Sequence, residues 1–527
     1  MKKLLVILLA MVLIVSTFAG CGNNAATNET TSSQSQTSEK AKPVEVSVAI
    51  WDIENALKNG ESDAVLKKVQ EDLNIKIVGM NTTWDDYSQK IQLWAASNEL
   101  PDLFAIDVVG SSFYYNWIEQ GVVQPLPEDV SKYPKLAEYL KTPDIEALKV
   151  DGKYYTIPRM TWPEVKMSGI ERGIVYRWDL AQKAGITKEP ETYDELRTMI
   201  KAITKDNAEG KNIGGLTSVQ TQMIDGVLFP YSLPLAMSDG SGSDYKWVEK
   251  DGKYMPAYFA GDALSTFQLA RDMYTEGTIE KDIALTKSQQ AYDKFVQGLS
   301  AGIIMNTQAA TIQSKLANAW AEVYPDKPFE ESCKIVNPLK AKDGNTYSAV
   351  FKDYWSESYI ATKDATKMDA ILRMADYFLT DENKVMLRYG FEGEDYTVSA
   401  DGTKVPNEGV VLYEKYPFTN ISGLIEWDNS ISGLKPSGNK ENDKYIKMVN
   451  DYYSKIEKTT LPDFEPAYTN ISTPLKNKFI IKPADDLLTI MTGTESVEKM
   501  YKDLMANYES KGLSKMIDEV NAVIKSK

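Results

Sequence analysis

Bulky apolar residues occupy every second position of residues 44–50 (VEVSVAI), and this period of two predicts a strand with one buried face. Apolar residues then recur at four-residue steps from Val65 to Leu73, which predicts an amphipathic helix. The two patterns keep alternating, with strands expected at residues 75–78 and 103–106 and helices at 85–98 and 111–121. This alternation predicts an α/β fold with a parallel sheet covered on both faces.

A second set of elements follows the turn at Asp151-Gly152. Thr192 and Glu195 have the spacing of a capping box, which opens a helix by satisfying two of its free backbone N–H groups. No period repeats along the chain, so a solenoid is not expected. The elements expected here are extended segments at residues 153–158, 174–176, 302–306 and 346–362, and helices at 179–184, 192–205, 263–276, 368–388 and 497–524.

The first twenty residues have the pattern of a secretion signal. Lys2 and Lys3 precede a run of apolar residues at 4–15, which is too short to span a bilayer comfortably. The run leads to Phe-Ala-Gly-Cys at residues 18–21, which resembles a bacterial lipobox with Phe in place of the usual Leu. We therefore expect a lipoprotein signal peptide at 1–20 and a lipid on Cys21. The alternative is an ordinary secretion signal with an incidental cysteine.

Residues 21–42 are rich in Asn, Thr, Ser, Gln and Ala and carry almost no apolar bulk. Such a segment cannot bury enough surface to offset its ordering entropy, so we expect a flexible tether. Together with a lipid on Cys21, it would hold a folded body at the outer face of a cell membrane, as in Gram-positive bacteria.

Composition narrows the function. The 527 residues include no histidine and two cysteines, and they carry a formal net charge of −16. The absence of histidine excludes Ser-His-Asp and Cys-His catalysis and imidazole zinc sites, and two cysteines exclude a disulfide framework. The negative charge repels phosphate backbones, so nucleic acid is not an expected partner. Aromatic residues make up 10% of the chain, which favours a binding protein.

Four motifs, in this order along the chain, carry a family resemblance: NELPDLF at residues 98–104, GKYYTIP at 152–158, YRWDL at 176–180 followed by AGI and PETYDEL up to residue 196, and YGFEGEDY at 389–396. With the lipobox and tether, the chain resembles the family 1 extracellular solute-binding proteins of bacterial ABC importers, the maltose-binding-protein-like group, and within it the large Gram-positive lipoprotein branch.

The resemblance implies a two-lobed periplasmic-binding-protein-like fold of type II, with discontinuous α/β lobes joined by a hinge. We expect one lobe to hold residues 43–157 plus 340–398 and the other 158–339 plus 399–527. It further implies a monomer without cofactors that binds a carbohydrate, which we expect to be an oligosaccharide, and delivers it to the permease subunits of an ABC transporter. Ligands of open α/β sheets bind beyond the carboxyl ends of the strands, so the site is expected there.

A sugar offers flat apolar faces and rings of hydroxyl groups, which tryptophan faces and polar side chains can satisfy. Each candidate also has a structural alternative: tryptophans pack in cores, arginines brace ion pairs, and short polar residues cap helices or turns. Residues near expected strand ends or lobe crossings are the candidate ligand contacts: Trp51, Asp52, Asp107, Arg159, Trp162, Tyr176, Arg177, Asn306, Trp355, Glu357 and Trp427.

Some members of the family carry an acidic calcium loop after the helix that the capping box opens. The equivalent residues here are 204–212 (TKDNAEGKN), where Ala208 and Gly210 interrupt the alternating oxygen ligands that calcium requires. No metal site is therefore expected.

Two other function classes remain open. A surface glycoside hydrolase or lyase could work with paired carboxylates and no histidine. A lipoprotein sensor or adhesin could bind a surface polymer without transport. The chain has no Gly-Lys-Ser/Thr phosphate loop, so it is not the transporter ATPase.

Overall fold

The structure is a computed structural model. It describes residues 42–526 except 84–85, 110, 222, 236–245, 350–353, 401, 429–432, 436–439, 464–467 and 469–470. The expected signal peptide, Cys21 and nearly all of the tether lie outside the described residues. None of the helices in the described part has the length and apolarity needed to cross a bilayer.

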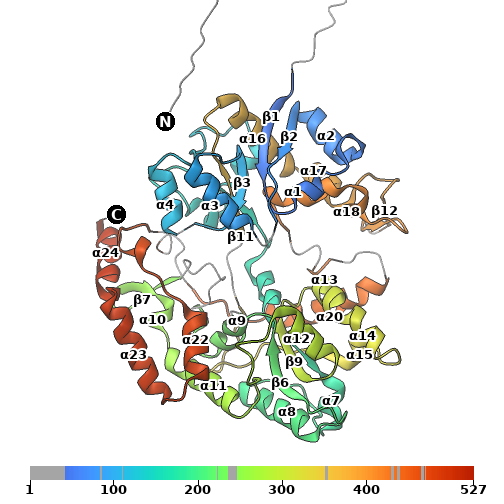
Figure 1. Cartoon of the computed structure of the whole chain (residues 1–527), viewed down its shortest axis with the longest axis vertical. Helices are drawn as coiled ribbons and strands as arrows, with labels where there is room; N and C mark the ends of the chain where they lie inside the picture. The colour runs from blue at the N-terminus through green and yellow to red at the C-terminus, as the bar shows by residue number, and fades with distance from the viewer. Residues whose placement is uncertain are drawn as a thin grey trace, which may run out of the picture. The chain divides into compact units, whose positions relative to one another are not determined.

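A five-stranded sheet forms the centre of the first lobe, by which we mean the elements packed around it (Figure 1). Its strand order is β2-β1-β3-β11-β4, with β1 parallel to β2 and β3 and with β11 antiparallel to its two neighbours. The strands are β1 Val44–Ala49, β2 Ile75–Gly79, β3 Leu103–Ile106, β4 Ile157–Met160 and β11 Tyr354–Ile360. Because β11 comes from a distant part of the chain, this lobe is discontinuous in sequence.

Helices cover this sheet. In α2, the Asp63 side chain accepts hydrogen bonds from the backbone N–H groups of Val65 and Leu66, and Asn74 ends the helix in a left-handed conformation. The helices and small elements of this lobe are α1 Ile53–Ala56, η1 Gly60–Ser62, α2 Ala64–Leu73, α3 Tyr87–Ser97, α4 Ser112–Glu119, α5 Pro134–Tyr139, α6 Pro143–Glu146, α16 Ala365–Phe378, α17 Asp381–Tyr389, β12 Tyr396–Val398, β13 Lys404–Pro406, α18 Leu412–Lys415 and η5 Pro417–Leu424.

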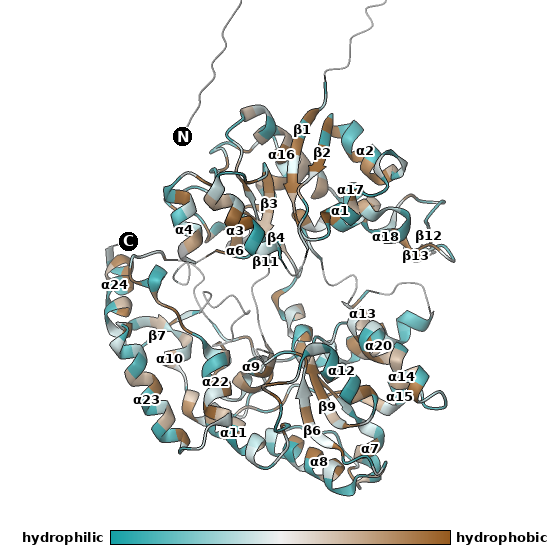
Figure 2. Ribbon diagram, in the orientation of Figure 1, coloured by the Kyte–Doolittle hydropathy of each residue, from teal (hydrophilic) through white to brown (hydrophobic). Residues whose placement is uncertain are grey.

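A four-stranded sheet of order β10-β5-β9-β6 forms the centre of the second lobe. Here β6 runs parallel to β9, whereas β5 runs antiparallel to both β9 and β10. The strands are β5 Gly173–Arg177, β6 Gly214–Ser218, β9 Ser300–Met305 and β10 Cys333–Ile335, and a separate hairpin consists of β7 Trp247–Lys250 and β8 Lys253–Pro256. Figure 2 shows the apolar character of the strands in both sheets.

The capping box predicted at Thr192 and Glu195 is confirmed at the start of α8, with both reciprocal hydrogen bonds present. The helices of this lobe are η2 Val165–Glu171, α7 Trp178–Lys183, α8 Tyr193–Asp206, α9 Met223–Leu228, η3 Phe229–Tyr231, α10 Ala257–Ala260, α11 Ala263–Thr275, α12 Ser288–Val296, α13 Ala309–Ile312, η4 Gln313–Ala317, α14 Asn318–Val323, α15 Phe329–Ser332, α20 Lys440–Ile456, η6 Lys476–Lys478, α22 Pro483–Thr492, α23 Val497–Ser510 and α24 Leu513–Ser526.

Two long helices expected from the sequence are each interrupted. The helix predicted over 368–388 is divided at Thr380, whose side chain accepts from the backbone N–H of Asn383 and so caps a new helix, α17. The helix predicted over 497–524 is divided by Gly512, whose φ of 98° no helical residue adopts. The extended segment predicted over 346–362 contains the shorter strand β11. The one predicted over 153–158 overlaps β4 only from Ile157 onward.

The buried apolar residues divide by sheet, and this division places residues 416–425 differently from the sequence analysis. Phe418, Ile421 and Leu424 lie in the core around the first sheet, although residues 399–527 were assigned to the second lobe. The backbone N–H of Phe418 also donates to the Asp63 carboxylate at 3.0 Å. Short 3-10 segments lack the regular apolar period that would have shown this in the sequence.

Three segments of the chain pass from one core to the other. The first follows Met160 and enters the second core at Trp162. The other two are defined only by their ends: Ala349 lies in the second core and Tyr354 in the first, and Ile425 lies in the first core and Leu434 in the second, with residues outside the described ranges between each pair. We call these the three crossing segments.

Candidate ligand-binding site

Three half-buried tryptophans gather at one edge of the first sheet. The ring centroids of Trp51 and Trp355 lie 5.5 Å apart, those of Trp51 and Trp427 lie 5.9 Å apart, and those of Trp355 and Trp427 lie 6.5 Å apart. Tyr87 extends the group, with its ring 5.2 Å from that of Trp51. We call Trp51, Trp355 and Trp427 the tryptophan cluster, and it offers partly exposed aromatic faces to an apolar ligand surface.

The strand directions explain why the cluster forms. Trp51 follows the carboxyl end of β1, whereas Trp355 lies near the start of β11, which runs the opposite way and therefore begins at the same edge. The backbone N–H of Trp427 donates to the carbonyl of Met160 at the end of β4, at 2.7 Å. Ser356, with a φ of 56°, lies in a bulge of β11 between Tyr354 and Glu357.

Arg159 lies at the centre of the cluster and is 0% exposed. Its guanidinium carbon is 4.7 Å from the ring centroid of Trp51, 5.1 Å from that of Trp427 and 5.8 Å from that of Trp355. It donates from Nη1 to the Ser356 hydroxyl at 2.5 Å and from Nε to the Gly423 carbonyl. Burial lowers the pKa of Arg159 to about 9, an effect that the nearby Glu357 charge opposes.

The three predicted acids differ in accessibility. Asp52 is exposed, so its carboxylate can meet a ligand or solvent, whereas Asp107 is half-buried and its Oδ1 atom is shielded from solvent. Glu357 is 0% exposed and accepts hydrogen bonds from the Tyr359 hydroxyl at 2.9 Å and from the backbone N–H of Val108 at 3.2 Å. Glu357 therefore fixes the loop after β3, while the other two remain at the surface of the site.

The predicted second-lobe residues do not form a comparable group. Trp162 is 1% exposed and lies in a core, where its indole N–H donates to the Glu171 carboxylate at 2.8 Å. Asn306 is half-buried, and its side-chain oxygen accepts from the backbone N–H of Gln308 at 2.9 Å. These contacts match the structural alternatives considered for both residues.

Tyr176 and Arg177 lie at the opposite edge of the second sheet from Asn306. Their position at the end of a strand predicts a place at the site, but β5 is antiparallel to β9. Gly173, at the start of β5, is therefore the residue that pairs with Met305 beside Asn306. Tyr176 and Arg177 are both 0% exposed.

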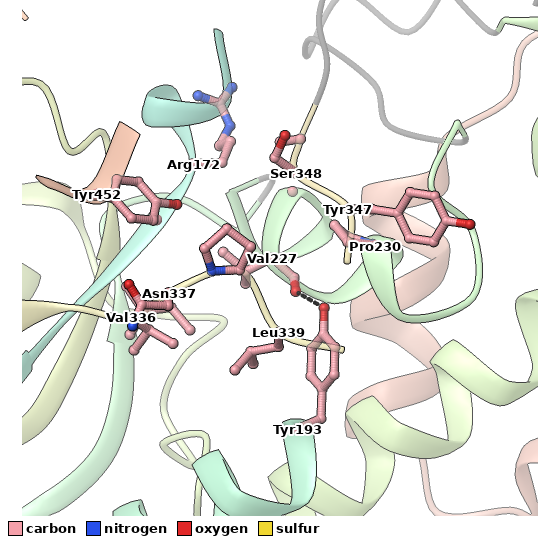
Figure 3. Close-up of a pocket in the computed structure, with 15 residues that line it drawn as sticks. Arg172, Tyr193, Val227, Pro230, Val336, Asn337, Leu339, Tyr347, Ser348 and Tyr452 are labelled. Atoms are coloured by element: carbon pink, nitrogen blue, oxygen red, sulfur yellow. Dashed lines mark hydrogen bonds between the residues drawn. The ribbon is translucent and has the colours of Figure 1, made fainter. Parts of the chain in front are cut away.

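A small pocket lies at the start of β5 instead (Figure 3). Its volume is about 50 Å³, and the Tyr193 hydroxyl at its wall donates to the Val227 carbonyl at 2.9 Å. The polar residues that line it, and that the sequence analysis did not single out, are Arg172, Asn337, Tyr347, Ser348 and Tyr452. Arg172 directly precedes an antiparallel strand, so only knowledge of the strand direction could have indicated it.

The loop at 204–212 holds its acidic side chain among cations. The Glu209 carboxylate accepts from Arg177 at 2.7 Å and from the Tyr324 hydroxyl at 2.9 Å, and Lys211 and Lys327 each lie 3.3 Å from it. The hydrogen bond and charge of Arg177 outweigh the effect of burial and lower the pKa of Glu209 to about 2. A carboxylate surrounded by three cationic side chains does not fit a divalent cation.

Asn207, a second oxygen source in this loop, accepts from the backbone N–H of Ile213 at 3.3 Å. Across the described ranges, no group of three or more His, Cys, Asp or Glu side chains has the arrangement of a metal site.

Comparison with known proteins assigns the family. The chain is 23% identical to the polygalacturonan/rhamnogalacturonan-binding protein YtcQ of Bacillus subtilis strain 168, over 88% of each protein. It is 22% identical to lipoprotein LipO of the same organism, over 85% of this chain and 86% of LipO.

The solved structure of the alginate-binding protein AlgQ2 without calcium ion matches with a TM-score of 0.65 and 18% identity, covering 92% of this chain and 98% of AlgQ2. This likeness confirms the predicted two-lobed fold of type II. The family model described as bacterial extracellular solute-binding protein matches residues 58–385, so the chain belongs to the bacterial extracellular solute-binding protein family.

Proposed function

We propose that this protein is a lipid-anchored extracellular receptor that captures a carbohydrate between its two lobes and delivers it to an ABC transporter permease. The observation that carries the proposal is the tryptophan cluster at the carboxyl edge of β1 and β3. Aromatic faces cover the apolar faces of sugar rings, and the exposed Asp52 and half-buried Asp107 can accept hydrogen bonds from sugar hydroxyls.

The relatives support a carbohydrate as the ligand. YtcQ is named for binding polygalacturonan and rhamnogalacturonan, and AlgQ2 for binding alginate. Both names refer to polymeric sugars, which favours an oligosaccharide for this chain.

A protein that binds the carbohydrate without cleaving it is better supported than a glycoside hydrolase or lyase. A glycosidase needs two carboxyl groups that can reach opposite sides of a glycosidic bond. Glu357 is fully buried and held by Tyr359 and Val108, so its carboxylate is occupied within the protein. The family is one of binding proteins, which also favours a receptor over a hydrolase or lyase.

The proposal also includes a lipid anchor on Cys21, a permease partner and a hinge between the lobes. Lipid on Cys21 would attach the protein to the outer face of the membrane, and LipO, a relative, is a lipoprotein by name. A monomer would present both lobes to the permease subunits. The first crossing segment, between Met160 and Trp162, would act as part of the hinge, because a few residues at element ends absorb the backbone changes of domain closure.

A thermal-shift panel of neutral and acidic oligosaccharides tests the function. A ligand that binds only the folded state raises the melting temperature, by an amount that grows with its concentration. We expect at least one oligosaccharide to do so, with no new reducing ends after prolonged incubation. New reducing ends would favour the hydrolase.

Two variants locate the site. Trp355→Ala should abolish or weaken the shift, whereas Trp178→Ala, a half-buried tryptophan on α7 outside the cluster, should leave it intact. Binding of the same sugar without any transport defect in cells lacking the protein would instead favour a sensor or adhesin.

A further inference from the structure

We propose that Arg159 is a positioning residue that sets the arrangement of the tryptophan cluster. This inference rests on the proposed function, because it treats the cluster as the ligand surface. It also reassigns Arg159, which the sequence analysis expected to touch the ligand directly.

The cluster is assembled from segments far apart in sequence, and Arg159 is their common neighbour. Trp51 follows β1, Trp355 lies in β11 and Trp427 follows η5, yet all three rings lie within 5.8 Å of the guanidinium carbon. Cation–π attraction is stronger for a desolvated guanidinium than for an exposed one. Removing the cation would therefore release three rings at once.

Hydrogen bonds fix the guanidinium itself. Its Nη1 donates to the Ser356 hydroxyl in the bulge of β11, and its Nε donates to the Gly423 carbonyl in η5. Gly423 leaves no space for a larger residue, because a Cβ atom there would lie 2.8 Å from the Trp427 ring and 3.1 Å from Nη2 of Arg159. The two hydrogen bonds and the close packing at Gly423 therefore hold the Arg159 guanidinium in place between the three tryptophan rings.

These contacts lie at the roots of the crossing segments. Arg159 is two residues before the first crossing segment begins at Thr161, and Ser356 is two residues after the second ends at Tyr354. Gly423 and Trp427 flank the point where the third leaves the first core. A backbone rotation in the first crossing segment, between Met160 and Trp162, would therefore start directly beside Arg159.

Stability alone does not account for this residue. No ion pair between Arg159 and a carboxylate is found among the residues that the structure describes, and its Nη2 has no hydrogen-bond partner there. A buried charge without a direct counter-ion is costly for the fold. Since Arg159 is also 0% exposed, it acts on the ligand through the rings it holds.

The test uses Arg159→Lys, which keeps the charge but loses the planar fork, and Arg159→Met, which loses both. The control is Arg177→Met, at the other fully buried arginine, which contacts Trp320 and Tyr324 in the second lobe. The readouts are the near-ultraviolet circular dichroism of the full chain, affinity for an oligosaccharide from the thermal-shift panel, and the melting temperature. Closely packed tryptophans give a strong near-ultraviolet signal, and because Arg177 also contacts Trp320, affinity for the oligosaccharide is the readout that a purely structural role would not move.

We expect Arg159→Met to reduce the near-ultraviolet tryptophan signal and to weaken binding by about tenfold or more, with Arg159→Lys intermediate. Arg177→Met should lower the melting temperature without changing the affinity of the folded fraction. Wild-type spectra and affinity in a folded Arg159→Lys would overturn the inference. If Arg159→Met does not fold, Arg159→Lys decides between these outcomes.

The two proposals can fail separately. If the wild type binds no carbohydrate, the proposed function fails, and the spectra of the Arg159 variants still decide whether Arg159 positions the rings. If the wild type binds, and the Arg159 variants have the same affinity and the same near-ultraviolet circular dichroism as the wild type, only the positioning role fails.

Discussion

Arg159 and Arg177 are both fully buried and both lie over aromatic rings, but Arg177 is paired with carboxylates, whereas Arg159 donates to neutral groups. Arg177 donates to the two oxygens of the Asp179 carboxylate at 2.8 Å each and to Glu209 at 2.7 Å. Arg159 donates to a hydroxyl and a backbone carbonyl. Burial lowers the pKa of both guanidinium groups, yet the bonds to Asp179 and Glu209 raise that of Arg177 above its ordinary value, whereas that of Arg159 stays lowered.

The difference separates two uses of a buried cation. Arg177 is satisfied by carboxylates of its own lobe and joins α7 to the loop after α8, which is a structural role. Arg159 is surrounded by partly exposed tryptophans and stands directly beside the first crossing segment, which points to binding. Burial alone therefore does not distinguish a core arginine from a site arginine, whereas the identity of its partners does.

The largest effect should come from breaking the Arg177 site. Arg177→Met leaves the partly buried Glu209 and Asp179 without their main partner, so the free energy of unfolding should fall by about 3–5 kcal/mol. Urea denaturation with probes in each lobe would measure it. The matched control is Arg197→Met, since Arg197 is 20% exposed and pairs with Glu276 at 2.7 Å. A control loss equal to that of Arg177→Met would contradict the structural role.

Next in size is the loss of one ring above Arg159. Trp355→Ala should weaken oligosaccharide binding by about 1–3 kcal/mol, because one stacking face and one cation–π contact disappear together. Isothermal titration calorimetry would measure this, with Trp178→Ala as the control. Equal affinity of the two variants would show that the ligand surface lies elsewhere.

Acid should weaken the Arg177 site and leave the Arg159 site largely unaffected. The pKa of Glu209 is about 2 in the folded protein and near 4.5 ordinarily, so its ionised form stabilises the fold above about pH 4.5. That contribution is lost as the pH falls toward 2. Glu209→Gln should therefore cost about 1 kcal/mol at neutral pH, after allowance for solvent screening, and progressively less in acid. A pH-independent difference in melting temperature between the wild type and Glu209→Gln would refute this.

The smallest expected effect is that of calcium. Because Arg177, Lys211 and Lys327 surround Glu209, neither calcium nor a chelator should change the melting temperature of the wild type. Magnesium at equal ionic strength serves as the control for screening. A calcium-specific stabilisation that Glu209→Gln removes would show that the cation displaces these side chains.

The sequence was sufficient for most of the fold and for the tryptophan cluster. A period-two pattern located β1, a four-residue pattern located α2 and the capping box located α8, while short apolar runs indicated β2 and β3. The family motifs supplied the two-lobed arrangement. Trp51, Arg159, Trp355 and Trp427 were all chosen as candidates and lie together, although their contact with a ligand stays a prediction.

Strand direction could not be predicted from the sequence, and it determines which second-lobe residues lie at the edge of the sheet where the site was expected. Local periodicity does not specify whether a strand runs parallel or antiparallel, because that depends on partners distant in sequence. The carboxyl end of β5 was therefore taken as part of the site, and Tyr176 and Arg177 were included while Arg172 was not. The placement of residues 416–425 depended in the same way on a distant contact, that of Phe418 with Asp63.

Cys333, at the start of β10, has a practical consequence for measuring lobe closure. It is a free cysteine, it is 0% exposed, and burial raises the pKa of its thiol well above the usual range. Maleimide dyes react with accessible thiolate, so this position should remain unlabelled in the native state. With Cys21 replaced by serine, one cysteine introduced on α2 and another on α8 would accept a donor and an acceptor dye. Energy transfer between the two dyes would then report closure of the two lobes in real time.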